Sequence, residues 1–325
     1  MSVAASSEEN ALPLSLPLST SIHLCFDPSF RTPVEEQIRR IARAGFRWLD
    51  FNFLDWFADP RSPFVGGGWE AWLEGAGAAA EDAGARFNQA HAPCPVYSLE
   101  RDLERYKALC RRAIRGCGML GIPWMVFHAA YYPWNFGSSL DFFAFNQAFF
   151  GELLEDCHRY SVGIAIENIW PVLQDIPIWS TDALIQLADS FHDPLVGICW
   201  DTGHGNLTGN SHNYKAHNTP QFLPYGNQYE SLTKIGGRLK ALHIHDNNGM
   251  DDDHLPPFFG TIQWKEVLRG LRDIGYRHSF TFEAHYAVRR LPPALLDDGI
   301  AYLYKVGRAL LDGALSKGTS APANR

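Results

Sequence analysis

Short apolar runs of the kind that form β-strands recur along this chain of 325 residues, and a segment with helical periodicity follows each of them. The eight runs are Ser21–Cys25, Phe46–Phe51, Ala85–His91, Trp124–His128, Gly163–Glu167, Val196–Asp201, Leu239–His245 and Ser279–Glu283. Strands that alternate with helices pair in parallel, and eight such units predict a closed (β/α)₈ TIM barrel. The alternative, a doubly wound open sheet, should show a GxGxxG turn after an early strand, and none follows Cys25 or Phe51.

The barrel is expected to be a single α/β domain over residues 20–312, which suits the length of the chain. Residues 1–19 are expected to form a disordered N-terminal tail, and residues 313–325 a flexible C-terminal tail. The helices expected between the strands lie at 32–44, 69–84, 99–120, 139–159, 182–189, 229–236, 264–274 and 292–311.

The composition excludes several function classes. The formal net charge is −8, so the chain lacks the basic character that binding to phosphate backbones needs, and we expect no nucleic-acid partner. The six cysteines form no CxxC pair and are expected to be reduced and buried. The N-terminus lacks a basic n-region and no apolar run reaches membrane-spanning length, which favours a cytoplasmic protein with no membrane partner. A homo-oligomer remains an open alternative.

Ionisable residues stand where six consecutive strands are expected to end. They are His91, His128, Glu167, Asp201, His243, His245 and Glu283. The C-terminal ends of barrel strands meet at one rim, where barrel enzymes carry out their chemistry. Carboxylates crowded at such a rim repel each other unless a cation lies between them, so we expect a site for a divalent metal. Asp201 has a second interpretation, because it could also cap a following helical turn.

Five motifs, taken in order along the chain, resemble one known family. They are Ile166–Asn168 (IEN), Asp201–His204 (DTGH), His243–Asn247 (HIHDN), Asp252–Leu255 (DDHL) and Phe282–Glu283 (FE). Their order and spacing resemble those of the xylose isomerase-like barrel superfamily over about residues 20–312. That superfamily holds sugar and sugar-phosphate isomerases and epimerases, inosose-processing enzymes and the endonuclease IV family.

The resemblance implies a site for one divalent metal ion, with Mn²⁺ expected and Co²⁺, Mg²⁺ or Zn²⁺ as alternatives. Its four ligands would be Glu167, Asp201, His243 and Glu283. His243 is preferred over His245 because the ligand in these relatives lies three residues before an acidic residue, here Asp246.

Further residues match positions that contact substrate in the epimerases or hold additional zinc ions in endonuclease IV. These are His91, His128, His204, Asp252 and His254. All nine positions of the trinuclear site of endonuclease IV therefore have a counterpart in this chain. His245 shares a strand face with His243 and is expected to reach the substrate or the surroundings of the metal.

The function that the resemblance implies is that of a metal-dependent sugar or sugar-phosphate isomerase or epimerase. The metal would stabilise a cis-enediolate, while Glu167 and Glu283 act as the acid/base pair. Two alternatives stay open, an endonuclease IV-like multi-zinc phosphodiesterase acting on abasic DNA and an inosose dehydratase-like lyase.

The loops after the strands carry residues that bear on the substrate. Aromatic residues favour a pocket for a small polyol and include Phe53, Trp56, Tyr131, Trp134 and Trp170. Arg289 and Arg290 are the nearest candidates for holding a phosphate, although a solvated helix entry is the preferred interpretation of this pair.

Overall fold

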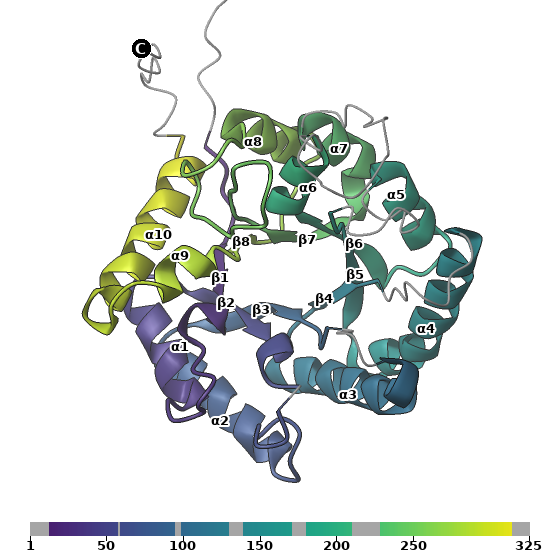
Figure 1. Cartoon of the computed structure of the whole chain (residues 1–325), viewed down its shortest axis with the longest axis horizontal. Helices are drawn as coiled ribbons and strands as arrows, with labels where there is room; N and C mark the ends of the chain where they lie inside the picture. The colour runs from purple at the N-terminus through teal and green to yellow at the C-terminus, as the bar shows by residue number, and fades with distance from the viewer. Residues whose placement is uncertain are drawn as a thin grey trace, which may run out of the picture.

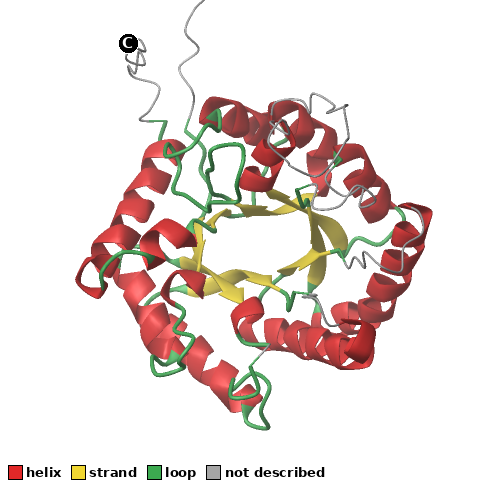
Figure 2. Cartoon of the chain, in the orientation of Figure 1, coloured by secondary structure: helices red, strands yellow, loops and turns green. Residues whose placement is uncertain are grey.

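The computed structural model describes residues 13–57, 59–94, 99–129, 139–170, 180–209 and 228–313. Eight strands form a ring, and helices form a layer around it (Figure 1 and Figure 2). The strands are β1 (Leu18–Ser21), β2 (Trp48–Asn52), β3 (Arg86–His91), β4 (Trp124–His128), β5 (Gly163–Glu167), β6 (Val196–Asp201), β7 (Leu239–His243) and β8 (Phe280–Phe282).

All neighbouring strands pair in parallel, in the order β7-β6-β5-β4-β3-β2-β1-β8. A parallel bridge between Ile244 and Phe282 brings the two ends of this sheet together next to β7 and β8. The predicted (β/α)₈ TIM barrel is therefore confirmed.

Most of the helices that surround the barrel begin and end close to the predicted positions. They are α1 (Val34–Arg43), α2 (Trp69–Asp82), α3 (Leu99–Leu120), α4 (Ser139–Tyr160), α5 (Thr181–Asp189), α6 (Thr202–Gly209), α7 (Gln228–Ile235), α8 (Trp264–Asp273), α9 (His285–Arg289) and α10 (Leu296–Leu311), with short 3₁₀ helices that include η1 (Ile22–Cys25) and η2 (Phe53–Asp55). Among the described residues, no helix combines the length and the apolar character needed to cross a bilayer.

The first strand differs from the prediction. The sequence predicted a strand at Ser21–Cys25, whereas β1 ends at Ser21 and η1 follows it. The Ser21 hydroxyl accepts a hydrogen bond from the His23 amide at 3.2 Å, which caps η1 and turns the chain there. The N-terminal tail predicted for residues 1–19 is too long, because the first two residues of β1 pair with β8.

Other strands agree more closely with the prediction. β4, β5 and β6 have their predicted bounds, whereas β7 ends at His243 and β8 ends just before Glu283. The helices α6 and α9, at the ends of β6 and β8, are absent from the sequence-based prediction. The α6 sequence TGHGNLTG has no apolar periodicity, so its pattern gave no helical signal.

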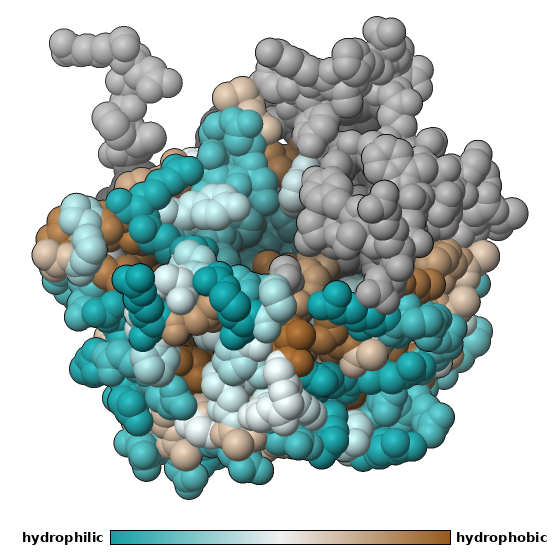
Figure 3. All heavy atoms as spheres, turned by 60° about the horizontal axis from the view of Figure 1, so that its bottom comes forward, coloured by the Kyte–Doolittle hydropathy of each residue, from teal (hydrophilic) through white to brown (hydrophobic). Residues whose placement is uncertain are grey.

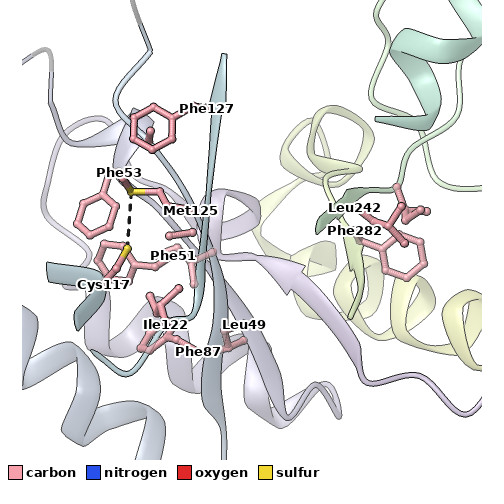
Figure 4. Close-up of a cluster of buried hydrophobic side chains, with 14 of the residues drawn as sticks. Leu49, Phe51, Phe53, Phe87, Cys117, Ile122, Met125, Phe127, Leu242 and Phe282 are labelled. Carbon is pink, nitrogen blue, oxygen red and sulfur yellow. Dashed lines mark hydrogen bonds between the residues drawn. The ribbon is translucent and has the colours of Figure 1, made fainter. Parts of the chain in front are cut away.

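The main hydrophobic core lies between the outer faces of the strands and the helices. The rings of Phe51 and Phe87 are 5.3 Å apart, and Phe51 also packs against Phe53 (Figure 4). From α3, the Cys117 Sγ lies 3.6 Å from the Met125 Sδ of β4. Each large apolar side chain buried in this way contributes roughly 1.5–3 kcal/mol. Hydrophilic side chains predominate on the face shown in Figure 3.

The barrel interior is divided into an apolar half and a polar half directly beneath the rim. Side chains two residues before a rim residue point to the same face of a strand. On β4 to β7 this lower layer is small and apolar and consists of Val126, Ala165, Cys199 and Ala241. On β3 and β8 it consists of Gln89 and Thr281, whose side chains form a hydrogen bond at 3.3 Å. The layer of side chains beneath the rim residues is therefore apolar on β4 to β7 and polar on β3 and β8.

Candidate metal centre

The ten residues singled out at the strand ends and in the motifs all come together at the C-terminal rim. They form overlapping groups in which the ligand atoms lie within 4.8 Å of one another. The groups are, first, Glu167, Asp201, His243 and Glu283; second, His91, His128 and Glu167; third, His204, His245, Asp252 and His254; and fourth, His91, His243 and Glu283.

The first group surrounds one ring nitrogen. His243 Nδ1 lies 3.0 Å from Glu167 Oε1, 3.3 Å from Glu283 Oε2 and 4.0 Å from Asp201 Oδ2. All four side chains are almost completely buried. Three carboxylates and an imidazole in this arrangement offer a compact set of hard oxygen donors with one nitrogen donor, which suits a divalent cation.

The second group shares Glu167 with the first. Glu167 Oε2 lies 3.1 Å from His128 Nε2 and 3.7 Å from His91 Nε2. The two histidine nitrogens are 3.3 Å apart. A single carboxylate between two groups is the geometry of a ligand that can bridge two metal ions.

The third group lies on the other side of Asp201. His245 Nε2 is 3.0 Å from Asp201 Oδ2, and His254 Nε2 is 3.0 Å from Asp252 Oδ2. His204 Nε2 lies 3.6 Å from the same Asp252 oxygen. His243 thus belongs to the first group and His245 to the third, so the two histidines of the HIH motif serve different groups.

Backbone carbonyls set the orientation of several of these rings. The Nδ1 atoms of His91, His204 and His254 lie 2.8 Å, 2.8 Å and 2.9 Å from the carbonyl oxygens of Ala92, Asn168 and Glu283, respectively. A carbonyl can only accept, so each Nδ1 carries a proton, and each Nε2 faces the cluster, where the loss of its own proton would free a lone pair for a metal. This is the usual way in which a protein prepares histidines as metal ligands.

Asp201 both caps a helix and faces the candidate metal centre, the two roles that its sequence position allowed. Its Oδ1 accepts a hydrogen bond from the His204 amide at 2.6 Å, which caps α6, while Oδ2 faces His245. Gly203 between them is required, since a Cβ at this position would lie 1.9 Å from the His245 ring. The DTGH motif therefore folds as a cap that also delivers two ionisable side chains to the centre.

The loop that carries Asp252 and His254 is held by one buried carboxylate. Asp246 accepts hydrogen bonds from the amides of Asn247, Phe258 and Ile262 and from the Trp264 indole nitrogen, at 2.9 to 3.2 Å. These four donors span both ends of the loop, so Asp246 fixes its shape. His254 adopts a left-handed backbone conformation with φ of 46°, which is a strained geometry of the kind found at functional sites.

Opposite charges shift the pKa values of the cluster against the effect of burial. Burial lowers the pKa of His243, but Glu283 and Glu167 raise it to about 10. Burial likewise lowers the pKa of His254, but Asp252 raises it to about 9. Burial would raise the pKa of Glu167, yet His243 and His128 bring it well below its usual value. The metal-free cluster therefore holds Glu167 ionised and keeps protons on His243 and His254.

Several buried atoms of the cluster have no hydrogen-bond partner within the described part of the chain. They are Asp252 Oδ1, His245 Nδ1 and Glu167 Oε2, among others; the last lies 3.1 Å from His128 Nε2 but without the geometry of a hydrogen bond. An unpaired buried polar atom costs roughly 1–3 kcal/mol, and more when it is charged. A divalent cation would satisfy the two carboxylate oxygens, so the residues present fit a metal.

The aromatic residues predicted to line a polyol pocket have different positions. Phe53 and Trp56 are buried in the hydrophobic core instead, where Phe53 packs against Phe51 and Trp56 packs against Trp72. Trp170 does lie at the centre, with its ring 4.6 Å from the His204 ring. Tyr131 and Trp134 fall outside the described residues.

A neighbouring polar cluster is absent from the sequence-based prediction. His23 Nδ1 lies 2.6 Å from Asp55, and its Nε2 accepts a hydrogen bond from Arg289 Nη1 at 2.9 Å. The ring of His285 lies between those of His23 and His254, at 4.0 Å and 4.4 Å. These residues come from η1, η2 and α9, which are distant in sequence, so only the closure of the barrel reveals the cluster. Arg289 is therefore anchored by its neighbours rather than being a simple solvated helix residue.

The comparison with known families agrees with this geometry. A family model described as xylose isomerase-like TIM barrel matches residues 38–306. The chain belongs to this family. Two curated proteins are similar in sequence, MJ1311 of Methanocaldococcus jannaschii and y4fM of Sinorhizobium fredii, and both are described as uncharacterized. They are 31% identical over 193 residues and 29% identical over 134 residues, which cover 57% and 41% of this chain. The matched regions span only 60% and 37% of those two proteins.

Solved structures of this xylose isomerase-like fold superpose over nearly the whole chain. A D-tagatose 3-epimerase-like protein has a TM-score of 0.66 at 20% identity and covers 92% of this chain and 100% of its own. A D-psicose 3-epimerase has a TM-score of 0.67 at 14% identity, with 91% and 100% covered. A xylose isomerase domain protein from Alicyclobacillus acidocaldarius has a TM-score of 0.68 at 16% identity, with 94% and 100% covered. At these identities the likeness concerns the fold.

Proposed function

We propose that this protein is a metal-dependent sugar isomerase or epimerase. The supporting observation is that carboxylates from two strands, Glu167 and Glu283, converge on His243 Nδ1 at 3.0 and 3.3 Å. Two carboxylates beside one metal position can act on a substrate from two sides. Structures with this fold include a D-psicose 3-epimerase, which suggests a small ketose or aldose as substrate.

The metal would be held by Glu167, Asp201, His243 and Glu283. When bound, a divalent cation supplies Lewis-acid stabilisation of the negative charge that develops on the sugar oxygens. His204 and His254 turn their Nε2 atoms toward the centre, where they can form hydrogen bonds with sugar hydroxyls. Trp170, whose ring lies beside that of His204, provides an apolar surface for the C–H face of a sugar.

The proton is moved by the two glutamates. One removes it from the carbon next to the carbonyl, and the other delivers a proton to the product. Glu283 keeps 8% of its side chain exposed and Glu167 only 1%, so Glu283 is the more accessible base. Acid–base assistance of this kind contributes typically ~10²–10⁴-fold to the rate.

The test is an interconversion assay on a panel of ketoses and aldoses, phosphorylated and neutral, with the Mn²⁺-loaded protein. Glu283→Gln should lower turnover by ~10²-fold or more while the protein stays folded. Glu266→Gln on α8, an exposed glutamate paired with Arg269, serves as the control and should keep full turnover. Equal turnover in wild type and Glu283→Gln would reject the proposed role.

A second function is favoured by one specific observation. Glu167 is shared by two groups, and a third group stands beside them, so the centre can hold more than one ion. Such a centre suits hydrolysis of a phosphodiester, as in the endonuclease IV alternative. Incubation of the Zn²⁺-loaded protein with an abasic-site oligonucleotide tests it, and strand cleavage without sugar interconversion would favour the hydrolase.

A further inference from the structure

Asp50 on β2 is a carboxylate in an unusual position. Its side chain is completely buried, and neither oxygen has a hydrogen-bond partner among the described residues. Buried carboxylates are ordinarily paired, because leaving one unpaired in a protein interior is costly. Asp55, a few residues later, shows the ordinary case, since it is buried but contacts His23 at 2.6 Å. An unpaired Asp50 therefore calls for a functional explanation.

The strand register places Asp50 inside the barrel, beneath the metal centre. Asp50 is aligned with Gln89 of β3 and with Ser21 of β1. Gln89 points inward, since its Nε2 donates to the Leu242 carbonyl across the barrel at 3.3 Å. Aligned residues of neighbouring strands face the same side, so Asp50 also points inward. Leu242 directly precedes His243, which puts this polar layer under the imidazole.

His243 also has a buried polar atom without a hydrogen-bond partner in the described chain. Its Nδ1 faces the carboxylates of the first group, whereas its Nε2 is buried with no partner in the described chain. A metal ion at Nδ1 requires the proton to be on Nε2, and that proton then needs an acceptor. Metal-binding histidines almost always donate this second N–H to a carboxylate, a carbonyl or water.

The two groups lie close enough to interact electrostatically, although no ion pair within 4.0 Å joins them. Burial raises the pKa of Asp50 to about 7, and the opposing effect of His243 is the largest of the charge interactions on this carboxyl. Asp50 in turn raises the pKa of His243. The Ser21 hydroxyl also lowers the pKa of Asp50, although it completes no hydrogen bond to either oxygen.

We infer that Asp50 is a positioning residue of the metal centre, whose carboxylate accepts the Nε2 proton of His243 when Nδ1 binds the metal. Because the two groups are more than 4.0 Å apart, metal binding then brings them together or places one water between them. This inference rests on the metal centre of the proposed function, but not on the identity of the substrate. Asp50 acts through His243 and needs no contact with the substrate.

The experiment compares wild type with Asp50→Asn, which keeps the shape of the side chain and removes its charge. We expect the affinity for Mn²⁺, measured by calorimetry, to fall about 10- to 100-fold, the usual effect of losing such a partner. We expect the thermal midpoint of the metal-free variant at pH 8 to equal or exceed that of wild type, because an unpaired buried charge has been removed. A purely structural role for Asp50 would lower that midpoint instead.

Asp55→Asn is the matched control, because Asp55 is a buried carboxylate that already has a partner. It should lower the thermal midpoint of the metal-free protein and leave Mn²⁺ affinity within about threefold of wild type. ¹⁵N NMR of the Zn²⁺-loaded wild type needs no variant, and it should show a proton on Nε2 of His243 in a strong hydrogen bond that is absent without metal.

The outcomes separate this inference from the proposed function. Wild-type protein that binds no divalent metal would overturn both. Wild type and Asp50→Asn that bind Mn²⁺ equally well would overturn the role of Asp50 alone. A loss of affinity that is fully explained by a lower thermal midpoint would also overturn it.

Discussion

Glu167 contacts His128 with one carboxylate oxygen, Oε2, at 3.1 Å, while its other oxygen faces the His243 ring at 3.0 Å. The same side chain therefore belongs to two potential metal positions. Loss of this one carboxylate should disturb both, whereas loss of a ligand such as Asp252, which belongs to the third group alone, should disturb one.

We expect Glu167→Gln to lower the metal content per chain more than Asp252→Asn does. The reason is that an amide cannot supply the negative charge that two groups share. Metal content after dialysis against Zn²⁺-buffered solution, measured by elemental mass spectrometry, checks this expectation. Equal losses in the two variants would show that Glu167 does not bridge.

Metal binding should become tighter as the pH rises from about 7 to about 9. In the metal-free protein, His243 and His254 have pKa values raised to about 10 and about 9, so both are protonated at pH 7. Each must lose its proton to act as a ligand, and binding therefore releases protons in this range. Calorimetry of Mn²⁺ binding in buffers of different ionisation enthalpy measures the release, and an affinity that falls with rising pH would be inconsistent with it.

The same raised pKa values affect the metal-free protein. Protonated His243 and His254 stabilise the folded state. This contribution is complete below the unfolded-state pKa of histidine, near 6.5, and disappears as the pH rises through about 9 to 10. Metal-free protein should thus lose thermal stability toward pH 10, and saturating Mn²⁺ should reduce that loss.

Cys94 should control the metal position that includes His128. Its Sγ lies 3.2 Å from His128 Nδ1, on the opposite side of the ring from Glu167. If Nε2 binds the metal, the Nδ1 proton is donated to the sulfur. Cys94→Val removes this acceptor and should weaken metal binding by roughly 10-fold, whereas Cys94→Ser retains an acceptor and should weaken it less. Competition with a chromophoric chelator measures both variants, and a Val variant that binds like wild type would contradict the assignment.

Arg289 should distinguish phosphorylated from neutral substrates. Its Nη1 donates to His23, and no carboxylate of the described chain pairs with its guanidinium, which leaves donors for an anion. If a phosphorylated sugar is turned over, Arg289→Gln should raise its KM by roughly 10-fold or more and leave neutral sugars unchanged. Arg290→Gln, whose side chain lies over Tyr286, is the control. An equal effect on both substrate classes would argue against a phosphate contact.

The sequence predicts the rim residues well because each follows an apolar strand and the barrel brings all strand ends together. The bounds of β5 and the place of Glu167 are clear from the run GIAIE alone. Asp50 was missed because it lies inside the predicted strand Phe46–Phe51 rather than at its end. A charged residue between two buried apolar neighbours in a strand was the available signal.

The remaining residues were missed for a different reason. His23 and Arg289 are 266 positions apart and meet only because β1 pairs with β8. No local pattern in the sequence records such a contact. The aromatic Phe53 was placed in the wrong environment, since hydrophobic character alone does not tell a pocket wall from a core position.

The transfer of a proton to and from carbon by Glu167 and Glu283 is tested most directly by isotope exchange. The Mn²⁺-loaded protein is incubated in D₂O with the sugar that it turns over best, and the recovered sugar is examined by NMR. We expect deuterium at the carbon beside the carbonyl with wild type, and at least ~10²-fold slower incorporation with Glu283→Gln. Conversion of the sugar without any deuterium incorporation, or unchanged incorporation in the variant, would contradict the proposed chemistry.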